Sequence, residues 1–304
     1  MAGLKELRVR ISSIASTKKI TSAMKMVAAA RLRKANDALD KSEKYHQGIL
    51  TIAGRLFKDL KDEEKNAGRM VNYPVVMQER PTIDNYLLVA FSSDRGLCGS
   101  FNSYVLRETL KRIKELESQG KNVKVLCIGK KIGDSLKNKR PDVVWDVLTG
   151  VAQKGARYRD AEQIMEPLVT EYISGGFDAC EVIYTYFNSP INREVKCRQL
   201  LPYVFDIDLN DKRYDDKLND AFYEYDTLEE KVFNDVVYML MFSEMFQMLL
   251  NSQASEQGAR MTSMDNATRN ASDMISKLTL KYNRLRQSAI TTELVEIISG
   301  AEAL

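Results

Sequence analysis

The sequence predicts a mixed α+β and α/β fold, in which N- and C-terminal helices form a long antiparallel coiled coil that carries an inserted α/β domain with a parallel sheet. Both ends of the chain carry apolar heptad patterns without proline. Five of the six prolines lie between residues 81 and 202. In that middle region, short apolar runs alternate with amphipathic helical patterns, which is typical of a parallel sheet covered by helices.

The N-terminal helix is predicted over residues 4–60. Its first apolar positions follow a 3-4 spacing, and a phase slip then places Ile20, Met24 and Val27 on the buried stripe. The stripe continues through Leu39, His46, Ile49, Ala53, Leu56 and Leu60. Because the first proline is Pro74, nothing interrupts the helix earlier.

The C-terminal helix is predicted from about residue 228 to residue 299. Apolar residues keep a 3-4 spacing from 261 to 289, and the phase slips by one from 290 to 304. Such a pattern indicates a coiled-coil seam. Since one compact domain joins the inner ends of both helices, the two helices are expected to run antiparallel. Residues 251–272 are rich in small polar residues, and we hypothesise that they form a weakly adhesive surface.

The middle of the chain is expected to form the α/β domain. Strands are predicted at 86–93, 123–129, 143–150 and 180–188, and helices at 101–118, 130–138 and 158–174. The expected division is a coiled-coil helix over 1–75, a Rossmann-like α/β foot over 76–210 and a second coiled-coil helix over 211–304.

Composition narrows the class of protein. The longest fully apolar run, residues 236–242, is too short to cross a bilayer, so no direct membrane insertion is expected. Four widely spaced cysteines form no CxxC pair and favour a reducing compartment. Residues 1–35 hold nine lysines or arginines against one acid, Glu6. This imbalance fits a solvated helix face, a targeting peptide or a docking face for an acidic protein. Nucleic acid is disfavoured because no aromatic residue precedes Tyr45.

Signs of catalysis are weak. His46, the single histidine, falls on the apolar stripe and is interpreted as a satisfied interhelical imidazole. The loop 92–102, SSDRGLCGSFN, leaves a strand and opens a helix, but it lacks the phosphate-loop lysine and the GxGxxG spacing. Its glycines are interpreted as turn residues. No cofactor, no metal site and no catalytic residue is therefore expected.

Three stretches together resemble the gamma subunit of F-type ATP synthases. They are the N-terminal IASTKKITSAMKMVAAARL, the loop SSDRGLCGSFN, and the C-terminal region that contains ARMTSMDNAT and NRLRQSAITTELVEIISGA. The stretch MTSMDNATRNASDMISKLTL is most similar to mitochondrial members. Ser100 and the segments 153–164 and 205–218 depart from the family pattern.

The resemblance implies a non-catalytic central rotor shaft. Such a shaft couples proton-driven rotation of the membrane c-ring to conformational cycling of the catalytic beta subunits, and so to ATP synthesis or, in reverse, hydrolysis. Expected partners are the alpha and beta subunits of the hexamer, the delta and epsilon foot subunits and the c-ring. The implied location is the matrix side of the mitochondrial inner membrane, or alternatively the cytoplasmic side of a bacterial plasma membrane.

The resemblance also implies contact residues. Met24 and Lys25 match positions that face the lever region of beta. Residues that match other contacts with the alpha/beta ring are Arg260, Arg286, Gln287 and Thr291.

The C-terminal tip is informative without the family. Its aliphatic residues cover more of the helix than one seam partner can bury, so they are expected to form an apolar bearing surface. They include Leu294, Ile297, Ile298, Ala301 and Leu304.

Two other classes stay open at this point. One is a structural coiled-coil scaffold that self-associates through its heptads, and the other is a nucleotide-binding α/β enzyme that dimerises through its helices. Tight binding of a nucleotide to the isolated chain would favour the enzyme, and a stable homo-oligomer of the chain alone would favour the scaffold.

Overall fold

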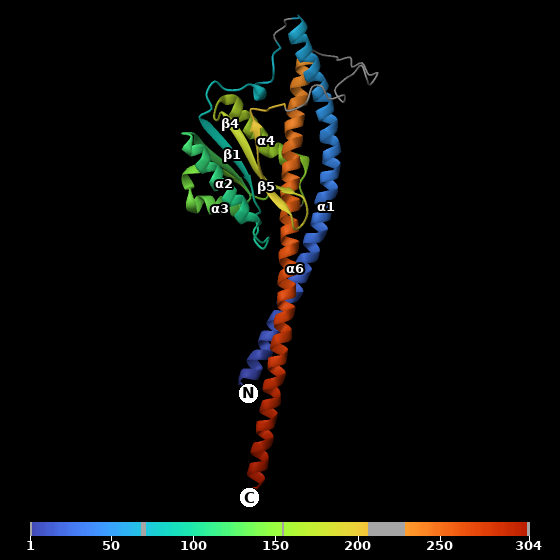
Figure 1. The fold of residues 1–304 in the computed structure, drawn as a ribbon, viewed down its shortest axis with the longest axis vertical. Coiled ribbons are helices and arrows are strands. Elements are labelled where there is room, and N and C mark those ends of the chain that lie inside the picture. The colour runs from blue at the N-terminus through green and yellow to red at the C-terminus, as the bar shows by residue number, and fades with distance from the viewer. Residues whose placement is uncertain (1, 68–70, 154, 206–228, 303–304) are drawn as a thin grey trace. The chain divides into compact units, whose positions relative to one another are not determined.

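The structure is a computed structural model that describes residues 2–67, 71–153, 155–205 and 229–302 (Figure 1). The chain divides into two compact units. The two-helix unit comprises residues 1–30 and 260–304, and the sheet unit comprises residues 31–259.

Two long helices supply the ends of the chain. Helix α1 spans Ala2–Ala67 and helix α6 spans Glu229–Glu302, which confirms both predicted helices. Within the two-helix unit, Lys18 contacts Ser272 and Lys25 contacts Asp265. Because the partner number falls as the α1 number rises, the helices are antiparallel. In the sheet unit, Gln247 likewise contacts Glu43 and Phe233 stacks on Phe57.

The predicted phase slip in α1 is wrong. Ile20 and Val27 are 60% and 54% exposed, whereas Thr21 and Ala28 are 9% and 1% exposed. In each unit, the buried or half-buried positions of α1 keep a single heptad phase, so the seam passes through polar positions instead of shifting to the larger side chains. These positions include Leu4, Leu7, Ile11, Ile14, Lys18, Thr21, Lys25 and Ala28 in the two-helix unit, and Leu32, Ala35, Leu39, Ser42, His46, Ile49, Ala53, Leu56 and Leu60 in the sheet unit.

The sheet contains the four predicted strands and a fifth. They are β1 (Asn85–Phe91), β2 (Asn122–Ile128), β3 (Val144–Leu148), β4 (Ala179–Phe187) and β5 (Arg193–Leu201), in the order β3-β2-β1-β4-β5. The first four are parallel, as predicted, and β5 is antiparallel to β4. The sequence analysis missed β5 because its REVKCRQLL pattern is largely polar, as suits an edge strand.

Helices cover both faces of the sheet. Alternate residues of β1 point to opposite sides: Leu88 and Ala90 pack with α2 (Phe101–Ser118) and α3 (Lys130–Lys139). Leu87 and Val89 pack with α4 (Tyr158–Ser174) and with the parts of α1 and α6 in the sheet unit. Two short 3-10 helices, η1 (Val75–Met77) and η2 (Pro141–Val143), complete the domain.

The small polar residues near the middle of α6 fasten it to the sheet. Ser252 Oγ accepts a hydrogen bond from Thr185 N at 3.3 Å, and Ser255 Oγ donates to Thr185 O at 3.1 Å. A Cβ on Gly258 would lie 3.2 Å from the Phe187 ring. Our hypothesis of a weakly adhesive surface over residues 251–272 is therefore wrong for 251–259, which pack closely against β4 and the turn after it.

His46 is buried between the helices, but its Nδ1 has no hydrogen-bond partner in the part of the chain that the structure describes. The interpretation as a satisfied imidazole is thus wrong for this atom. Burial lowers the pKa of His46, an effect that nearby Glu43 opposes and Arg198 reinforces. The single histidine is accordingly neutral at physiological pH.

Two buried carboxylates connect the sheet to the helices on its two faces, and their pKa values are shifted in opposite directions. Burial alone would raise the pKa of Glu181, but Arg112 donates two hydrogen bonds to it at 2.6 and 2.7 Å, and the net pKa is lowered. Burial raises the pKa of Glu244 despite contacts at 3.1 Å from both Arg198 and the Tyr203 hydroxyl. Glu181 is therefore a fully charged anchor, whereas the charge of Glu244 is only partly compensated.

Replacing Gly133 with alanine is expected to destabilise the fold by about 1–3 kcal/mol, because the new methyl group would meet Val147 Cγ1 of β3 at 2.6 Å. Gly48→Ala is the matched control, since a Cβ there meets nothing within 4 Å. It should stabilise the helix by about 0.5–1 kcal/mol. Denaturant unfolding of the full chain measures both. Equal effects of the two substitutions would contradict the close packing of α3 on β3.

Replacing Glu181 with glutamine is expected to cost about 1–3 kcal/mol at neutral pH, because Arg112 loses a charged partner. The pKa of Glu181 is depressed in the folded state, so its contribution is present above the unfolded pKa and is lost as the pH falls through the folded pKa. The difference between variant and parent should therefore shrink as the pH falls below the usual range of a glutamate carboxyl group. Glu117→Gln, in a more exposed pair with Arg140, should change stability little at any pH. If the stability difference between Glu181→Gln and the parent did not depend on pH, the charge of Glu181 would make no contribution to stability.

Candidate contact surface

Side chains of the loop after β1 bind backbone amides at the start of α3 and in the turn after β3. Asp94 accepts hydrogen bonds from Lys130 N, at the start of α3, and from Gly150 N, both at 3.0 Å. Ser92 Oγ accepts another from Ile132 N at 3.0 Å. A bound phosphate would need amides of this kind at a helix N-terminus, and here the carboxylate of Asp94 already uses them. The loop turns at Leu97 and Gly99, whose φ angles are 66° and 57°, so the interpretation as a turn glycine is supported for Gly99, whereas Gly96 does not have a positive φ.

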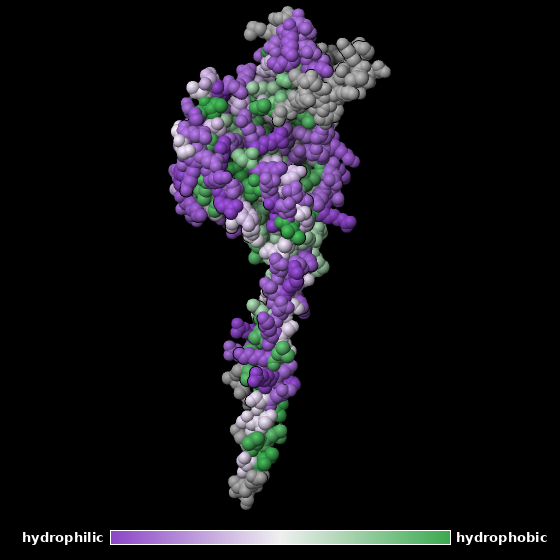
Figure 2. Space-filling view, in the orientation of Figure 1, coloured by the Kyte–Doolittle hydropathy of each residue, from purple (hydrophilic) through white to green (hydrophobic). Residues whose placement is uncertain are grey.

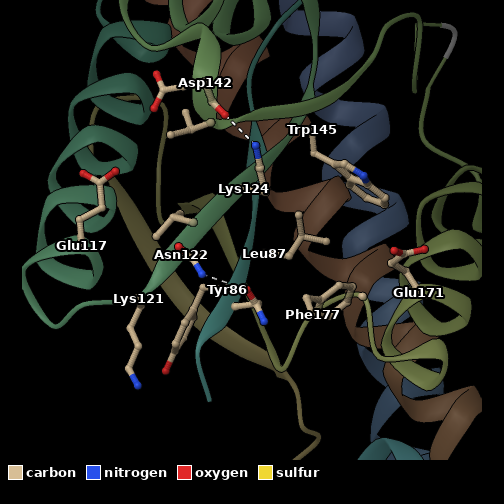
Figure 3. A pocket seen from close by; sticks show the side chains of 14 residues that line it. Tyr86, Leu87, Glu117, Lys121, Asn122, Lys124, Asp142, Trp145, Glu171 and Phe177 are labelled. Atoms are coloured by element: carbon tan, nitrogen blue, oxygen red, sulfur yellow. Dashed lines mark hydrogen bonds between the residues drawn. The ribbon is translucent and has the colours of Figure 1, made fainter. Parts of the chain in front are cut away.

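A cavity of about 470 Å³ lies at the opposite edge of the sheet, near the amino ends of β1 and β2 (Figure 3). Two carboxylates of its lining, Glu117 and Asp142, are paired with Arg140, which lies outside the lining. Arg140 lies 2.6 Å from Glu117 and 2.7 Å from Asp142, and it lowers the pKa of both carboxyl groups. Lys124 donates to the Asp142 carbonyl at 2.8 Å. Neither paired carboxylate is thus suited to act as a general base near neutral pH. Among the described residues, no cluster of three histidine, cysteine, aspartate or glutamate side chains could hold a metal ion.

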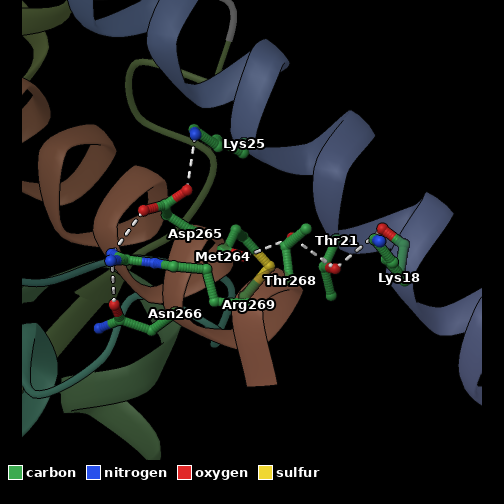
Figure 4. Close-up of polar contacts among 8 residues, drawn as sticks. All are labelled: Lys18, Thr21, Lys25, Met264, Asp265, Asn266, Thr268 and Arg269. Atoms are coloured by element: carbon green, nitrogen blue, oxygen red, sulfur yellow. Dashed lines mark hydrogen bonds and ion pairs between the residues drawn. The ribbon is translucent and has the colours of Figure 1, made fainter. Parts of the chain in front are cut away.

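The two-helix unit carries a ladder of polar contacts across its seam, and Figure 4 shows two of them, Thr21 with Thr268 and Lys25 with Asp265. Lys18 donates to Ser272 Oγ at 3.1 Å, Thr268 donates to Thr21 Oγ1 at 2.8 Å, and Lys25 forms an ion pair with Asp265 at 2.6 Å. The ladder exists because the heptad phase of α1 brings Lys18, Thr21 and Lys25 to the seam.

Asp265 joins both helices. Its Oδ1 contacts Lys25, and its Oδ2 accepts from Arg269 at 2.7 Å on the same helix (Figure 4). The hydrogen bond from Lys25 is the largest cause that lowers the pKa of Asp265, so the carboxylate is charged. Asp265 and Asp273 are the only acids among residues 260–292, and this part of α6 is otherwise basic.

The structure brings together only some of the residues expected to contact the ring. Met24 is half-buried beside the seam, and the neighbouring Lys25 is bound to Asp265. Arg260 is half-buried at the start of the α6 segment in this unit. Arg286, Gln287 and Thr291 are exposed on later turns of α6, and the Thr291 hydroxyl donates to the Gln287 carbonyl at 3.0 Å.

The described part of the tip is exposed. Leu294, Ile297 and Ile298 are 54%, 68% and 56% exposed. Figure 2 shows hydrophobic residues gathered near the C-terminal end of α6. The side chain of Ala301 and the whole of Leu304 lie outside the described residues.

A second exposed apolar surface, which was not predicted from the sequence, lies on α1. Ile20, Met26 and Val27 of α1 are 60%, 65% and 54% exposed, on the side away from the polar seam. The expected phase slip had assigned Ile20 and Val27 to the interior. An unbroken heptad count from Leu4 would have identified this outward stripe, defined here as Ile20, Met26 and Val27.

Comparison with known proteins agrees with the sequence resemblance. A family model described as ATP synthase matches residues 3–304. The ATP synthase gamma chain of Rhodospirillum rubrum is 43% identical over 310 residues, with 100% of both chains covered. That of Paramagnetospirillum magneticum is 40% identical over 304 residues, again with 100% of both covered.

Solved structures agree as well. A chain from the central stalk and c-ring structure of the Tetrahymena thermophila mitochondrial ATP synthase matches with a TM-score of 0.57 and 28% identity, covering 82% of this chain and 99% of that one. A chain from the Euglena gracilis mitochondrial enzyme matches in fold, with a TM-score of 0.54 and 18% identity over 90% of this chain and 95% of that one.

The curated relatives do not support the mitochondrial location that the sequence resemblance implied. Those named above are bacterial, and the bacterial alternative fits them. At 40–43% identity over its full length, the chain belongs to the ATP synthase gamma-chain family and is the non-catalytic central-stalk subunit, the rotor shaft, of an F-type ATP synthase.

Proposed function

We propose that this rotor shaft meets the alpha and beta subunits of the catalytic ring through its two-helix unit, and the delta and epsilon subunits and the c-ring through its sheet unit. The observation that carries the proposal is the exposed apolar surface of the two-helix unit, at the tip and along the outward stripe of α1. Burying each large aliphatic side chain is worth about 1.5–3 kcal/mol, so such surfaces favour a partner.

The tip is proposed to turn inside an apolar collar formed by the ring. Leu294, Val295, Ile297 and Ile298 are all more than half exposed, and at about 100° per residue they spread over an arc of roughly 160° around the helix. A seam partner would cover only one side. A collar that surrounds the helix would cover all of them.

The outward stripe is proposed to contact the lever region of beta, together with Met24 and Lys25. Lysines and arginines outnumber the single acid in residues 1–35 by nine to one, so an acidic partner is favoured electrostatically. Arg260, Arg286, Gln287 and Thr291 are proposed to contact loops of the ring farther along α6. No nucleic-acid partner is proposed.

A single shaft inside a ring explains how identical beta subunits hold different states. The three subunits have the same sequence, so a difference among them must come from an asymmetric partner that favours a different conformation in each. Met24 on one helix and Gln287 on the other present different chemistry to the ring. Rotation of the shaft then moves each conformation from one beta subunit to the next.

The sheet unit is proposed to bind the foot subunits and the c-ring. Val75 and Val204 are 46% and 60% exposed, and they lie close together because Tyr203 N donates to Val76 O at 2.6 Å. Exposed aliphatic residues at one end of a folded domain suit a protein contact.

The proposed location is an energy-coupling membrane, at which this subunit is peripheral. No helix in the described part of the chain is long and apolar enough to span a bilayer. The bacterial relatives support the cytoplasmic side of a bacterial plasma membrane. The matrix side of the mitochondrial inner membrane is the alternative, and the solved structures with similar chains come from mitochondrial enzymes.

Ending the chain after Thr292 is expected to lower the yield of assembled complex and to weaken retention of the shaft, because the apolar tip is lost. A full-length variant with Leu294→Ser, Ile297→Ser and Ile298→Ser should reproduce the effect, which separates surface chemistry from length. Co-purification with tagged beta measures retention. Normal yield and retention for both variants would rule out the tip as an anchor.

Replacing Gln287 with leucine should reduce steady-state ATP hydrolysis by the complex several-fold while leaving assembly intact. The substitution keeps the volume but leaves a polar ring group unpaired, at a cost of about 1–3 kcal/mol where that group is desolvated. A cost confined to one angular position raises a barrier, and each 1.4 kcal/mol or so is tenfold in rate. Ser288→Ala is the neighbouring control. If the Gln287→Leu complex hydrolysed ATP at the same rate as the parent complex, at matched subunit stoichiometry, this contact would play no part in rotation.

A further inference from the structure

We propose that Asp265 is an internal stand-in for a ring carboxylate: it binds Lys25 while no partner is opposite, and an acidic side chain of the ring displaces it. This inference rests on the proposed contact between the two-helix unit and the ring, and it adds a mechanism by which that contact is made and released.

The starting point is the place of Lys25 in the heptad. It occupies a seam position, where a lysine reduces coiled-coil stability unless it finds a partner. Lys18, one heptad earlier, has a neutral partner among the described residues: its ammonium group donates to the Ser272 hydroxyl at 3.1 Å. Lys25 finds a carboxylate at 2.6 Å. The chain therefore supplies a charged partner to one of these two seam lysines and a neutral partner to the other.

The ion pair is held loosely enough to exchange. The side chains of Lys25 and Asp265 are 45% and 29% exposed, and ion pairs this accessible to water contribute little net stability. The flexible stem of Lys25 lets its ammonium group swing to an acceptor on a neighbouring chain without moving the helix.

Asp265 also has a second cation. Arg269 contacts its other oxygen at 2.7 Å and, at the same time, the side chain of Asn266 at 3.1 Å (Figure 4). When Lys25 leaves, the carboxylate keeps a charged hydrogen-bond partner, so the cost of breaking the pair is reduced. An ion pair whose only purpose was to brace the two helices would not need this second partner.

The acceptor has to come from another chain. Residues 1–35 contain one acid, Glu6, and residues 260–292 contain only Asp265 and Asp273. Because the nearby surface is basic, an acidic side chain on a partner is attracted to it, and that side chain competes with Asp265 for Lys25.

The test compares Asp265→Asn with Lys25→Gln in the shaft assembled with alpha and beta subunits. The measured quantity is the dissociation constant of the shaft from the ring at low ionic strength. Exchange predicts opposite signs: Asp265→Asn frees Lys25 and tightens binding about two- to five-fold, whereas Lys25→Gln weakens it by a similar factor, as suits an exposed ion pair. The double variant should behave like Lys25→Gln.

Asp273→Asn is the matched control, because it removes the other acid of this segment and should leave the dissociation constant unchanged. High salt should abolish the difference between Asp265→Asn and the parent. Asp265→Ser serves as a second variant, and circular dichroism of each purified chain verifies that its helices are intact.

The proposal is overturned if Asp265→Asn and Lys25→Gln change the dissociation constant in the same direction, because the ion pair would then only hold the two helices together. It is also overturned if neither substitution changes the dissociation constant. In either case, weakened retention of the chain shortened after Thr292 would leave the proposed ring contact standing. If that truncation also has no effect, the contact surface itself is refuted.

Discussion

The antiparallel seam between α1 and α6 is the constraint on which the other features depend. Its heptad phase decides which side chains of α1 face α6 and which face outward. In the sheet unit the phase buries Leu56 and Leu60 in a conventional apolar core. In the two-helix unit the same phase brings Lys18, Thr21 and Lys25 inward and sends Ile20 and Val27 outward. The polar ladder and the apolar outer stripe are thus two results of one register.

The attachment of the sheet follows from the same helices. Small residues on α6 let β4 approach closely, so Ser252 and Ser255 bond directly to the backbone of Thr185. Glu181 adds a charged anchor on the other side of the sheet through Arg112. The α6 contacts at Thr185 and Phe187 hold the end of β4 on the helix, and the Arg112 contact holds β4 on α2.

Much of the fold could be predicted because its elements are long and strongly patterned. Four strands and all the longer helices follow from apolar periodicity and from the positions of proline. The seam phase in α1 could not be predicted from hydrophobicity, because the stronger apolar residues lie outside and two lysines, Lys18 and Lys25, lie at the seam. The edge strand β5 was missed for a related reason, since few of its side chains are buried.

The candidate site was predictable only in part. The tip follows from the sequence because its aliphatic residues exceed what one partner can cover. The pairing of Lys25 with Asp265 joins residues 240 positions apart, and it becomes visible only when the register of the two helices is known. The outward stripe was hidden by the same error in phase. Positions such as Gln287 carry no local signal, because an exposed glutamine on a helix is unremarkable without its partner.

Asp94 has a further consequence for a subunit that works beside catalytic nucleotide sites. In α/β sheets, the crevice at the carboxyl ends of the strands is where nucleotides commonly bind. Here the carboxylate of Asp94 holds the amides of Lys130 and Gly150 and carries the same sign of charge as a phosphate. The amides that would hold a phosphate in other α/β sheets are thus already occupied by a carboxylate of the chain itself, so this crevice is built as a structural joint between β1, α3 and the turn after β3.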